Sequence, residues 1–251
     1  MAQDLFDLSG KVAIVTGGSR GLGREMVLAF ADHGADVVIA SRKLANCEAV
    51  AEEVRAKGRR ALAIAYHAGS WTDAERVAEE AYAEFGRVDV LVNNAGMSPL
   101  YPSLDAVTEE LWDKVLDVNL KGPFRLSVLV ATRMQQGDGG CIINVSSIAS
   151  QAPSPNEAPY GAAKAGVNNL TRSLAVAYGP KVRVNCIVPG PFLTDISKAW
   201  DLEAFAKHSA PRIAMGRAGE PHEIVGAALY LATGASSYTT GALLNVDGLA
   251  K

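Results

Sequence analysis

The stretch Lys11-Val-Ala-Ile-Val-Thr16 is followed directly by Gly17-Gly18-Ser19-Arg20-Gly21-Leu22-Gly23. Its first six residues form a short apolar run of β-formers, which predicts a strand. After the glycines, Met26, Val27 and Phe30 recur at helical spacing and predict a helix. A strand, a glycine turn and a helix in this order make the first half of a βαβ unit.

The same alternation of strand and helix continues along the chain. We expect further strands at 36–40, 61–65, 88–92, 141–145, 182–188 and 242–246. We expect helices at about 44–57, 72–86, 108–134, 160–178 and 221–231. Because the strands are nearly continuous in apolar residues, they predict a doubly wound parallel sheet covered by helices on both faces. The fold class is therefore α/β, with a single domain over 1–251 and a lid-like insertion at about 190–218.

Two local signals refine the expected helices. Thr72 and Glu75 have the spacing of a capping box, so the helix after the third strand should begin near Thr72. Pro123 lies inside the long helical pattern and should kink or strain that helix near 119–122. In open parallel sheets, ligands bind at the carboxyl ends of the strands. The glycine turn, Ser147 and the segments that follow other strands should therefore meet in one cleft.

Composition excludes several classes of partner. The 251 residues are 49% apolar and 20% charged, with a net charge of −3 and no basic block. Nucleic acid and anionic membranes are therefore not expected as main partners. No apolar run approaches the roughly 18 residues of a membrane span, and no signal peptide is recognised. The three cysteines and four histidines show neither disulfide nor metal spacing, so we expect a cytoplasmic protein without a metal site.

A tyrosine and a lysine four residues apart carry the candidate chemistry. Pro159 suits the first turn of a helix, so Tyr160 and Lys164 should share a face one turn apart. A nearby ammonium and the helix dipole both favour a phenolate, which predicts a tyrosine tuned for proton transfer to a carbonyl or from an alcohol. Ser147 is placed to hydrogen-bond the same oxygen. Taken alone, the pair is equally compatible with a surface tyrosine beside a solvated lysine.

The glycine turn predicts a dinucleotide site. Glycines between a strand and a helix let the backbone approach a diphosphate at the positive end of the helix. No Gly-Lys-Ser/Thr follows, which argues against a nucleoside-triphosphate loop. The alternative is a tight strand-to-helix connection without a ligand.

The end of the second strand indicates which dinucleotide would bind. Ser41-Arg42-Lys43 stands where a carboxylate would grip a ribose 2′-hydroxyl, and Arg20 lies in the loop opposite. Because arginine forms forked, charge-assisted bonds with phosphate, we predict NADP(H) over NAD(H). The alternative is that Arg42 and Lys43 merely open a solvated helix.

Together these residues resemble the classical short-chain dehydrogenases/reductases, in particular the 3-ketoacyl-carrier-protein reductases and carbonyl reductases. The motifs follow the order of the family over nearly the whole chain: Thr16-Gly17-x-x-x-Gly21-x-Gly23, Asn93-Asn94-Ala95-Gly96, Asn119, Ser147, Tyr160-x-x-x-Lys164 and Pro189-Gly190 with Thr194. The resemblance implies a seven-stranded Rossmann-like sheet, a homotetramer, and hydride transfer between a nicotinamide and an alcohol or ketone.

The resemblance also implies roles for single residues. Tyr160 is the general acid/base, Ser147 positions the substrate oxygen, and Lys164 lowers the pKa of the tyrosine and holds the nicotinamide ribose. Asn119 anchors a water of a proton relay that includes Lys164. The residues implied to bind the cofactor are Gly17, Ser19, Arg20, Gly21, Leu22, Gly23, Ser41, Arg42, His67, Ala68, Asn94, Ala95, Gly96, Tyr160, Lys164, Phe192 and Thr194.

Within that set, the resemblance assigns 94–96 to the adenosine side and Phe192 and Thr194 to the carboxamide. After the third strand the family usually has an Asp followed by an apolar residue near the adenine, whereas this chain has His67-Ala68. The contact of His67 with adenine therefore stays open.

The sequence predicts an NADP(H)-dependent oxidoreductase that interconverts a small-molecule ketone and a secondary alcohol. The alternatives are a non-catalytic NADP(H)-binding regulator on the same fold and an NAD-dependent alcohol or steroid dehydrogenase. The lid-like segment carries Phe192, Ile196, Trp200, Leu202 and Phe205, which hint at a partly apolar substrate or serve the packing of the lid. A 3-ketoacyl thioester, a steroid, a sugar and a small ketone or quinone all remain open as substrates.

Overall fold

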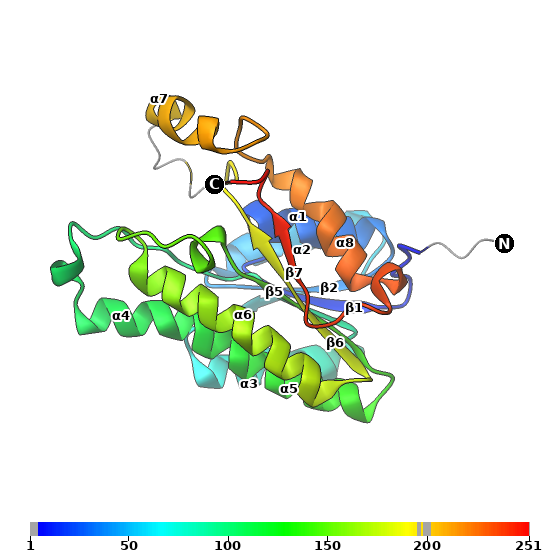
Figure 1. Cartoon of the computed structure of the whole chain (residues 1–251). Helices are drawn as coiled ribbons and strands as arrows, with labels where there is room; N and C mark the ends of the chain where they lie inside the picture. Colours follow the sequence, from blue (N-terminus) through cyan, green and yellow to red (C-terminus); the bar gives the residue numbers. More distant parts are fainter. Residues whose placement is uncertain (1–4, 195–196, 198–201, 251) are drawn as a thin grey trace.

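A seven-stranded sheet forms the centre of the computed structural model, which describes residues 5–194, 197 and 202–250 (Figure 1). The strands are β1 (Val12–Thr16), β2 (Asp36–Ser41), β3 (Ala61–Ala65), β4 (Val90–Asn93), β5 (Gly140–Val145), β6 (Val182–Pro189) and β7 (Leu243–Val246). Their order is β3-β2-β1-β4-β5-β6-β7, and every neighbouring pair is parallel. This confirms the predicted α/β fold class and the seven-stranded parallel sheet.

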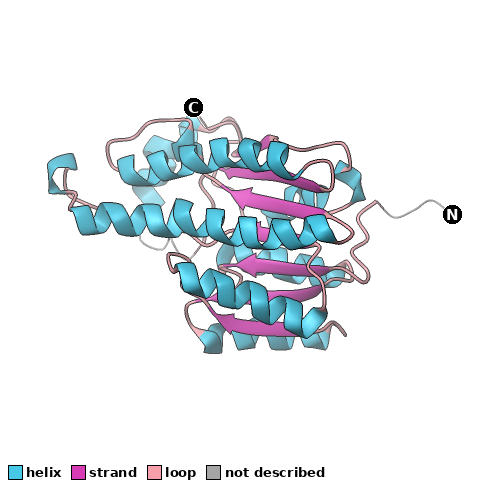
Figure 2. Cartoon of the chain, turned by 90° about the horizontal axis from the view of Figure 1, so that it is seen from below, coloured by secondary structure: helices cyan, strands magenta, loops and turns pink. Residues whose placement is uncertain are grey.

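Helices cover both faces of the sheet (Figures 1 and 2). The α-helices are α1 (Gly21–Asp32), α2 (Leu44–Ala56), α3 (Trp71–Phe85), α4 (Glu109–Leu116), α5 (Gly122–Gln136), α6 (Ala158–Tyr178), α7 (Leu202–Ala204) and α8 (Val225–Ala232). In Figure 1, α1, α2 and α8 lie on one face, and α3 to α6 lie on the other. Strands covered on both sides must be apolar at every position, which explains why the strand patterns in the sequence are continuous rather than alternating.

The two faces of the sheet carry two separate hydrophobic cores. Along β1, Ala13 and Val15 belong to the core beneath α1, α2 and α8, whereas Ile14 belongs to the core beneath α3, α5 and α6. All three side chains are fully buried. Successive residues of a strand point to opposite faces, so each strand contributes to both cores in turn.

Two helix predictions meet different outcomes. α3 begins at Trp71 rather than Thr72, because Ser70 is the N-cap and its hydroxyl accepts from the backbone N–H of Asp73 at 3.1 Å. The predicted capping box at Thr72 is therefore wrong by two residues. The distortion expected near 119–122 is confirmed: a π-helical turn, Asp117–Lys121, separates α4 from α5 immediately before Pro123.

The segment predicted as an irregular lid is partly helical. α7 continues into a π-helical turn (Phe205–Ser209) and a short 3₁₀ helix (Ala210–Arg212). In Figure 1 this segment projects from the rest of the fold at the carboxyl edge of the sheet. Ile196 and Trp200, which the sequence analysis assigned to the lid, lie outside the described residues.

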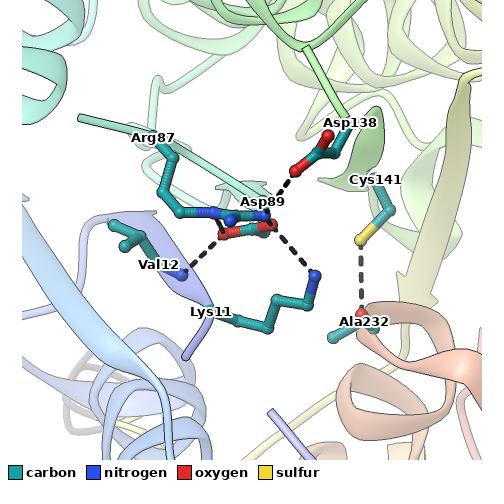
Figure 3. A network of polar contacts seen from close by, with 7 residues as sticks. All are labelled: Lys11, Val12, Arg87, Asp89, Asp138, Cys141 and Ala232. Carbon is teal, nitrogen blue, oxygen red and sulfur yellow. Dashed lines mark hydrogen bonds and ion pairs between the residues drawn. The ribbon is translucent and has the colours of Figure 1, made fainter. Parts of the chain in front are cut away.

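A buried carboxylate ties β1 to β4 at the amino edge of the sheet (Figure 3). Asp89 accepts hydrogen bonds from the backbone N–H of Val12 at 3.0 Å, from Lys11 Nζ at 3.2 Å and from Arg87 Nε at 2.9 Å. Arg87 Nη2 also donates to the second carboxylate oxygen at 2.6 Å. The network lies at the opposite end of the strands from the glycine turn and Ser147, so it stabilises the fold and takes no part in the candidate site.

The loops that carry the motifs leave the sheet at its carboxyl edge. Asn93 pairs with Asn144 in the sheet, and Asn144 pairs with Cys186, so β4, β5 and β6 end close together. β1 ends beside them through the pairing of Val15 with Val92. No helix in the described part of the chain is both long enough and apolar enough to cross a membrane.

Candidate active site

Thr16 fastens the glycine turn to the end of β4. Its buried hydroxyl donates to the Val92 carbonyl at 3.2 Å and accepts from the backbone N–H groups of Asn94 and Ala95 at 3.0 and 3.1 Å. The side-chain amide of Asn94 in turn donates to the Thr16 carbonyl at 2.9 Å. These bonds hold the loops after β1 and β4 in one arrangement. The Asn94 side chain, expected near adenosine, is thus engaged with the protein backbone.

Gly17 and Gly23 of the glycine turn leave no room for a side chain. An added Cβ at Gly23 would lie 2.3 Å from the Gly17 carbonyl oxygen, and one at Gly17 would lie 2.8 Å from Asn94 Nδ2. Gly17 and Gly21 also have positive φ values, 66° and 53°. Glycine adopts these conformations without the steric cost that other residues have. The three glycines of the predicted motif are therefore required by the backbone itself.

The start of α1 fits a cofactor diphosphate. The helix begins at Gly21, and Arg20 provides no side-chain cap. The first N–H groups of a helix, here those of Gly21, Leu22 and Gly23, point out of its N-terminus. Together with the positive end of the helix dipole they favour a bound anion.

The glycine turn meets the end of β2 at the predicted 2′-phosphate position. Ser19 Oγ donates to Ser41 Oγ at 3.0 Å. Arg20 and Arg42 are both exposed, and neither forms an ion pair with a carboxylate of the described residues. Other exposed arginines do form such pairs, as Arg24 does with Glu53 at 2.5 Å. The Ser19–Ser41 bond therefore joins the glycine turn, which carries Arg20, to the end of β2, which is followed by Arg42; binding of a 2′-phosphate by these residues stays a prediction.

His67 and Ala68 follow β3. The His67 side chain is exposed, and its backbone N–H donates to Asp73 Oδ2 at 2.9 Å. Ala68 is buried, and its carbonyl oxygen lies so close to Gly122 that a Cβ there would approach it to 1.7 Å. The loop after β3 is thus fixed against the start of α5.

Asn119 lies fully buried in the π-helical turn and holds the loop after β4. Its Nδ2 donates to the carbonyls of Met97 and Val115 at 2.8 and 2.9 Å, and its Oδ1 accepts from the Met97 N–H at 3.1 Å. An added Cβ at Gly96 would lie 2.9 Å from this Oδ1 and 3.5 Å from Lys164 Nζ. Both amide protons of Asn119 are used, so a relay water could bind only other atoms of this turn.

Ser147, Tyr160 and Lys164 come together at the end of β5. The Ser147 side chain is hydrogen-bonded to Tyr160, and its Oγ also accepts from the Ala149 N–H at 3.1 Å. Lys164 Nζ lies 5.6 Å from the centre of the Tyr160 ring and donates to the Val145 carbonyl at 2.8 Å. Lys164 is only 3% exposed. The predicted sharing of one helix face is confirmed by this geometry.

The direction of the Tyr160 pKa differs from the sequence expectation. Burial raises the pKa of Tyr160 to about 12; the Ser147 hydrogen bond acts in the opposite direction, and the Glu157 charge adds to the increase. Burial likewise lowers the pKa of Lys164 to about 8, against a small opposing effect of Cys186. The expectation that Lys164 lowers the tyrosine pKa is therefore wrong for this structure. Desolvation disfavours the charged form of each group, and Lys164 is not among the groups that shift the Tyr160 pKa.

A chain of buried polar side chains, which the sequence analysis did not identify, lies beneath this site. Asn93 Nδ2 donates to Ser127 Oγ at 2.8 Å and to Asn144 Oδ1 at 2.9 Å. Asn144 Nδ2 donates to Thr171 Oγ1 at 2.9 Å. These bonds join β4 and β5 to α5 and α6, the helix that carries Tyr160. The two asparagines at the ends of apolar strands could have indicated this buried polar chain from the sequence. Ser127 and Thr171 could not, because nothing distinguishes them from other polar residues inside helices.

The loop after β6 returns over the glycine turn. An added Cβ at Gly21 would lie 3.6 Å from Thr194 Cβ, so this segment faces the start of α1. The Phe192 ring is buried and packs against Gly219, where a Cβ would approach the ring to 2.7 Å. The Phe192 side chain therefore serves packing, and the implied contact of this segment with the carboxamide stays a prediction.

A narrow cleft, with no free space for a water molecule, lies beside Tyr160 between the loop after β4, α4 and the start of α6, and it adjoins a wider groove of about 340 Å³ at Pro159. Its walls are formed by Pro99, Tyr101, Leu111, Val115, Glu157, Pro159 and Tyr160. The Tyr101 hydroxyl donates to the Pro155 carbonyl at 2.7 Å and accepts from the Ala158 N–H at 2.8 Å. Tyr101 therefore caps the helix that carries Tyr160 and Lys164, a role that its place in the sequence does not reveal.

A family model described as short chain dehydrogenase matches residues 11–204. The chain belongs to the short-chain dehydrogenase family. This short-chain dehydrogenase is 35% identical over 243 residues to dehydrogenase/reductase SDR family member 4 of Homo sapiens, covering 96% of this chain and 87% of that protein. It is 40% identical over 249 residues to an L-rhamnose 1-dehydrogenase (NAD(P)(+)) of Azotobacter vinelandii, covering 96% of each.

Solved structures of short-chain dehydrogenases superpose closely on this one. A 7α-hydroxysteroid dehydrogenase in complex with NADH and 7-oxo glycochenodeoxycholic acid has a TM-score of 0.94 at 32% identity, covering 99% of this chain and 97% of that one. A blue fluorescent protein from a metagenomic library, in complex with NADPH, has a TM-score of 0.90 at 34% identity, covering 98% and 100%. An NAD(P)-dependent dehydrogenase/reductase is therefore the class of enzyme to which this chain belongs.

Proposed function

We propose that this short-chain dehydrogenase is an NADP(H)-dependent oxidoreductase that interconverts a ketone and a secondary alcohol, with Tyr160 as general acid/base. One observation carries the proposal. Tyr160, bonded to Ser147 and one helical turn from Lys164, lies at the carboxyl end of β5, at the same edge of the parallel sheet as the glycine turn after β1. A proton donor and a dinucleotide cradle at one edge of a sheet are the combination that hydride transfer to a carbonyl needs.

The residues of the site would divide the work as follows. The nicotinamide, when bound, supplies the hydride that reduces the carbonyl carbon. Tyr160 gives its proton to the carbonyl oxygen, which becomes the hydroxyl of the product. Its raised pKa keeps the phenol protonated at neutral pH, which is the form that reduction requires. Ser147 donates a hydrogen bond to the same oxygen, and the Lys164 ammonium holds the nicotinamide ribose.

Two exposed arginines support the preference for NADP(H) over NAD(H). Arg20 and Arg42 flank the Ser19–Ser41 bond without a carboxylate partner among the described residues, so they are available to a 2′-phosphate. The relatives named above use both kinds of cofactor, so family membership alone does not decide the preference.

A pair of cofactor titrations tests the preference. Arg42→Ala should weaken NADPH binding by roughly 10–100-fold, because a charge-assisted bond contributes about 1.5–3 kcal/mol, and leave NADH binding nearly unchanged. Arg24→Ala, on the same helix–loop unit but paired with Glu53, is the matched control and should change neither. Tighter binding of NADH than of NADPH by the unchanged protein would overturn the assignment.

Replacement of Tyr160 tests the chemistry. Tyr160→Phe removes the hydroxyl alone, so the rate of ketone reduction should fall roughly 10²–10⁴-fold while the Kd for NADPH stays the same. Activity would be followed as loss of NADPH absorbance with a panel of neutral ketones. Tyr101→Phe, another cleft tyrosine, serves as comparison and should cost far less. Near-normal turnover in Tyr160→Phe would remove this residue from the proposed role.

A homotetramer is part of the same proposal. The outward face of α6 exposes Ala162, Ala165 and Val176, the last of them 86% exposed. Small residues allow close approach of helices, and a large exposed apolar side chain favours burial against a partner. Light scattering coupled to size-exclusion chromatography should give four times the chain mass; a monomer at micromolar concentration would contradict it.

A further inference from the structure

The cleft beside Tyr160 is apolar with one exception. Pro99, Leu111, Val115 and Pro159 supply apolar walls. Glu157, three residues before Tyr160, is the one ionisable side chain among the described residues of its wall besides the tyrosines. A single charge in an apolar wall acts strongly on any ligand bound beside it, because few other groups screen it.

The Glu157 carboxylate is not neutralised by the protein. Its Oε1 accepts from Ser98 Oγ at 3.4 Å, and no lysine or arginine of the described residues forms an ion pair with it. Glu157 is the N-cap residue of α6, yet its side chain does not cap the helix, because Tyr101 already accepts from the Ala158 N–H. Glu157 therefore lies in the wall of the cleft without a counter-charge from the described residues, close enough to Tyr160 for its charge to act on the phenol.

The neighbouring groove has the same character. It has a volume of about 340 Å³, adjoins the cleft at Pro159, and is lined by Leu104, Val107 and Trp112 among others. Its one ionisable residue is Glu109, and no cation of the described residues lines it. The Lys164 ammonium, 5.6 Å from the centre of the Tyr160 ring, is bonded to the Val145 carbonyl and lines neither the cleft nor the groove.

We infer that Glu157 is a specificity-determining residue that restricts this site to uncharged carbonyl and alcohol substrates with an apolar body, and that excludes substrates with an anionic group near the reacting carbon. The inference rests on the proposed function. A negative charge on the substrate about 6 Å from this carboxylate, in a partly exposed cleft, should weaken substrate binding by roughly tenfold. Keto acids and phosphorylated ketones are thereby disfavoured, whereas neutral ketones fill the apolar walls.

A matched pair of substrates tests the inference. Ethyl 4-oxocyclohexanecarboxylate and 4-oxocyclohexanecarboxylate share a ring ketone and differ in charge. The measured quantity is the ratio of their kcat/KM values with NADPH at one pH, because any effect of Glu157 on Tyr160 itself cancels in this ratio. The unchanged enzyme should prefer the ester. Glu157→Gln should lower the preference by about tenfold.

Two further variants separate charge from structure. Glu157→Asp keeps the charge and should keep the preference for the ester. Glu110→Gln removes a charge from the exposed first turn of α4 without touching the cleft, and should also keep it. A ratio that Glu157→Gln leaves unchanged, or that Glu110→Gln shifts equally, overturns the inference, and so does an ester that is not turned over. The proposed function falls on different evidence, namely an inactive ketone panel or an active Tyr160→Phe variant.

Discussion

Replacing Asp89 by Asn should destabilise the fold without touching the site. The carboxylate is 7% exposed and receives four hydrogen bonds, from Val12, Lys11 and twice from Arg87 (Figure 3). Asparagine has nearly the same size and keeps one acceptor oxygen for the Val12 N–H. Its amide nitrogen, however, turns a donor toward the donors of Arg87. The guanidinium then loses a charge-assisted pair of bonds.

The magnitude follows from the exposure of the partners. Removing one member of a fully buried ion pair costs about 3–5 kcal/mol, but Lys11 and Arg87 are 46% and 42% exposed and regain water. We therefore expect a loss of about 2–3 kcal/mol in the free energy of unfolding. For a chain of this length that corresponds to a Tm lower by roughly 5–10 °C.

The pH dependence has a defined sign. Burial acts to raise the pKa of Asp89, but the hydrogen bonds from Arg87 and Val12 and the charges of Lys11 and Arg87 outweigh it and hold the pKa below its ordinary value of 3.8. The stabilisation is therefore complete above about pH 4 and is lost as the pH falls through the lowered pKa. The difference between the unchanged protein and the Asn variant should shrink in the same window.

Urea unfolding followed by circular dichroism measures both effects. Asp138→Asn is the matched control, because Asp138 lies 3.5 Å from the same Arg87 and is 83% exposed. It should change stability by no more than about 0.5 kcal/mol. If Asp89→Asn costs no more than Asp138→Asn, or if its cost is the same at pH 3 as at pH 7, the reasoning from burial and charge is refuted.

Three other changes have defined outcomes. Asn119→Ala leaves the Met97 N–H and carbonyl without their partner and should cost about 2–4 kcal/mol in urea unfolding; a cost below that of Asp138→Asn would contradict the role given to Asn119. Because burial lowers the pKa of Lys164 to about 8, the ammonium is lost as the pH rises through that value, and the kcat for ketone reduction should decline above about pH 8. A profile flat to pH 10 would argue against it. Tyr101→Phe removes both hydrogen bonds that fix the start of α6. The free energy of unfolding should fall by about 1–2 kcal/mol, which lowers the Tm by a few degrees. The kcat should fall by a larger factor than that by which KM rises. An unchanged kcat would show that the cap does not position Tyr160.

The order of strands and helices could be read from the sequence because its causes are local. Apolar runs such as Val12–Thr16 and the glycines that follow depend only on residues adjacent in the chain. Gly17, Gly21 and Gly23 mark a backbone shape that other residues adopt only with strain. Pro123 likewise predicted a distortion of the helix, which is observed as the π-helical turn at Asp117–Lys121.

The tertiary structure decided what the sequence could not. The spacing of Tyr160 and Lys164 placed them on one face, but the direction of their pKa shifts depends on how much water the surrounding elements remove. The hydrogen bonds of Asn119 to Met97, of Tyr101 to the start of α6 and of Glu157 to Ser98 all join residues that are distant in the chain. Local pattern fixes which segments become strands and helices, whereas desolvation and hydrogen-bond partners exist only once those segments are packed together.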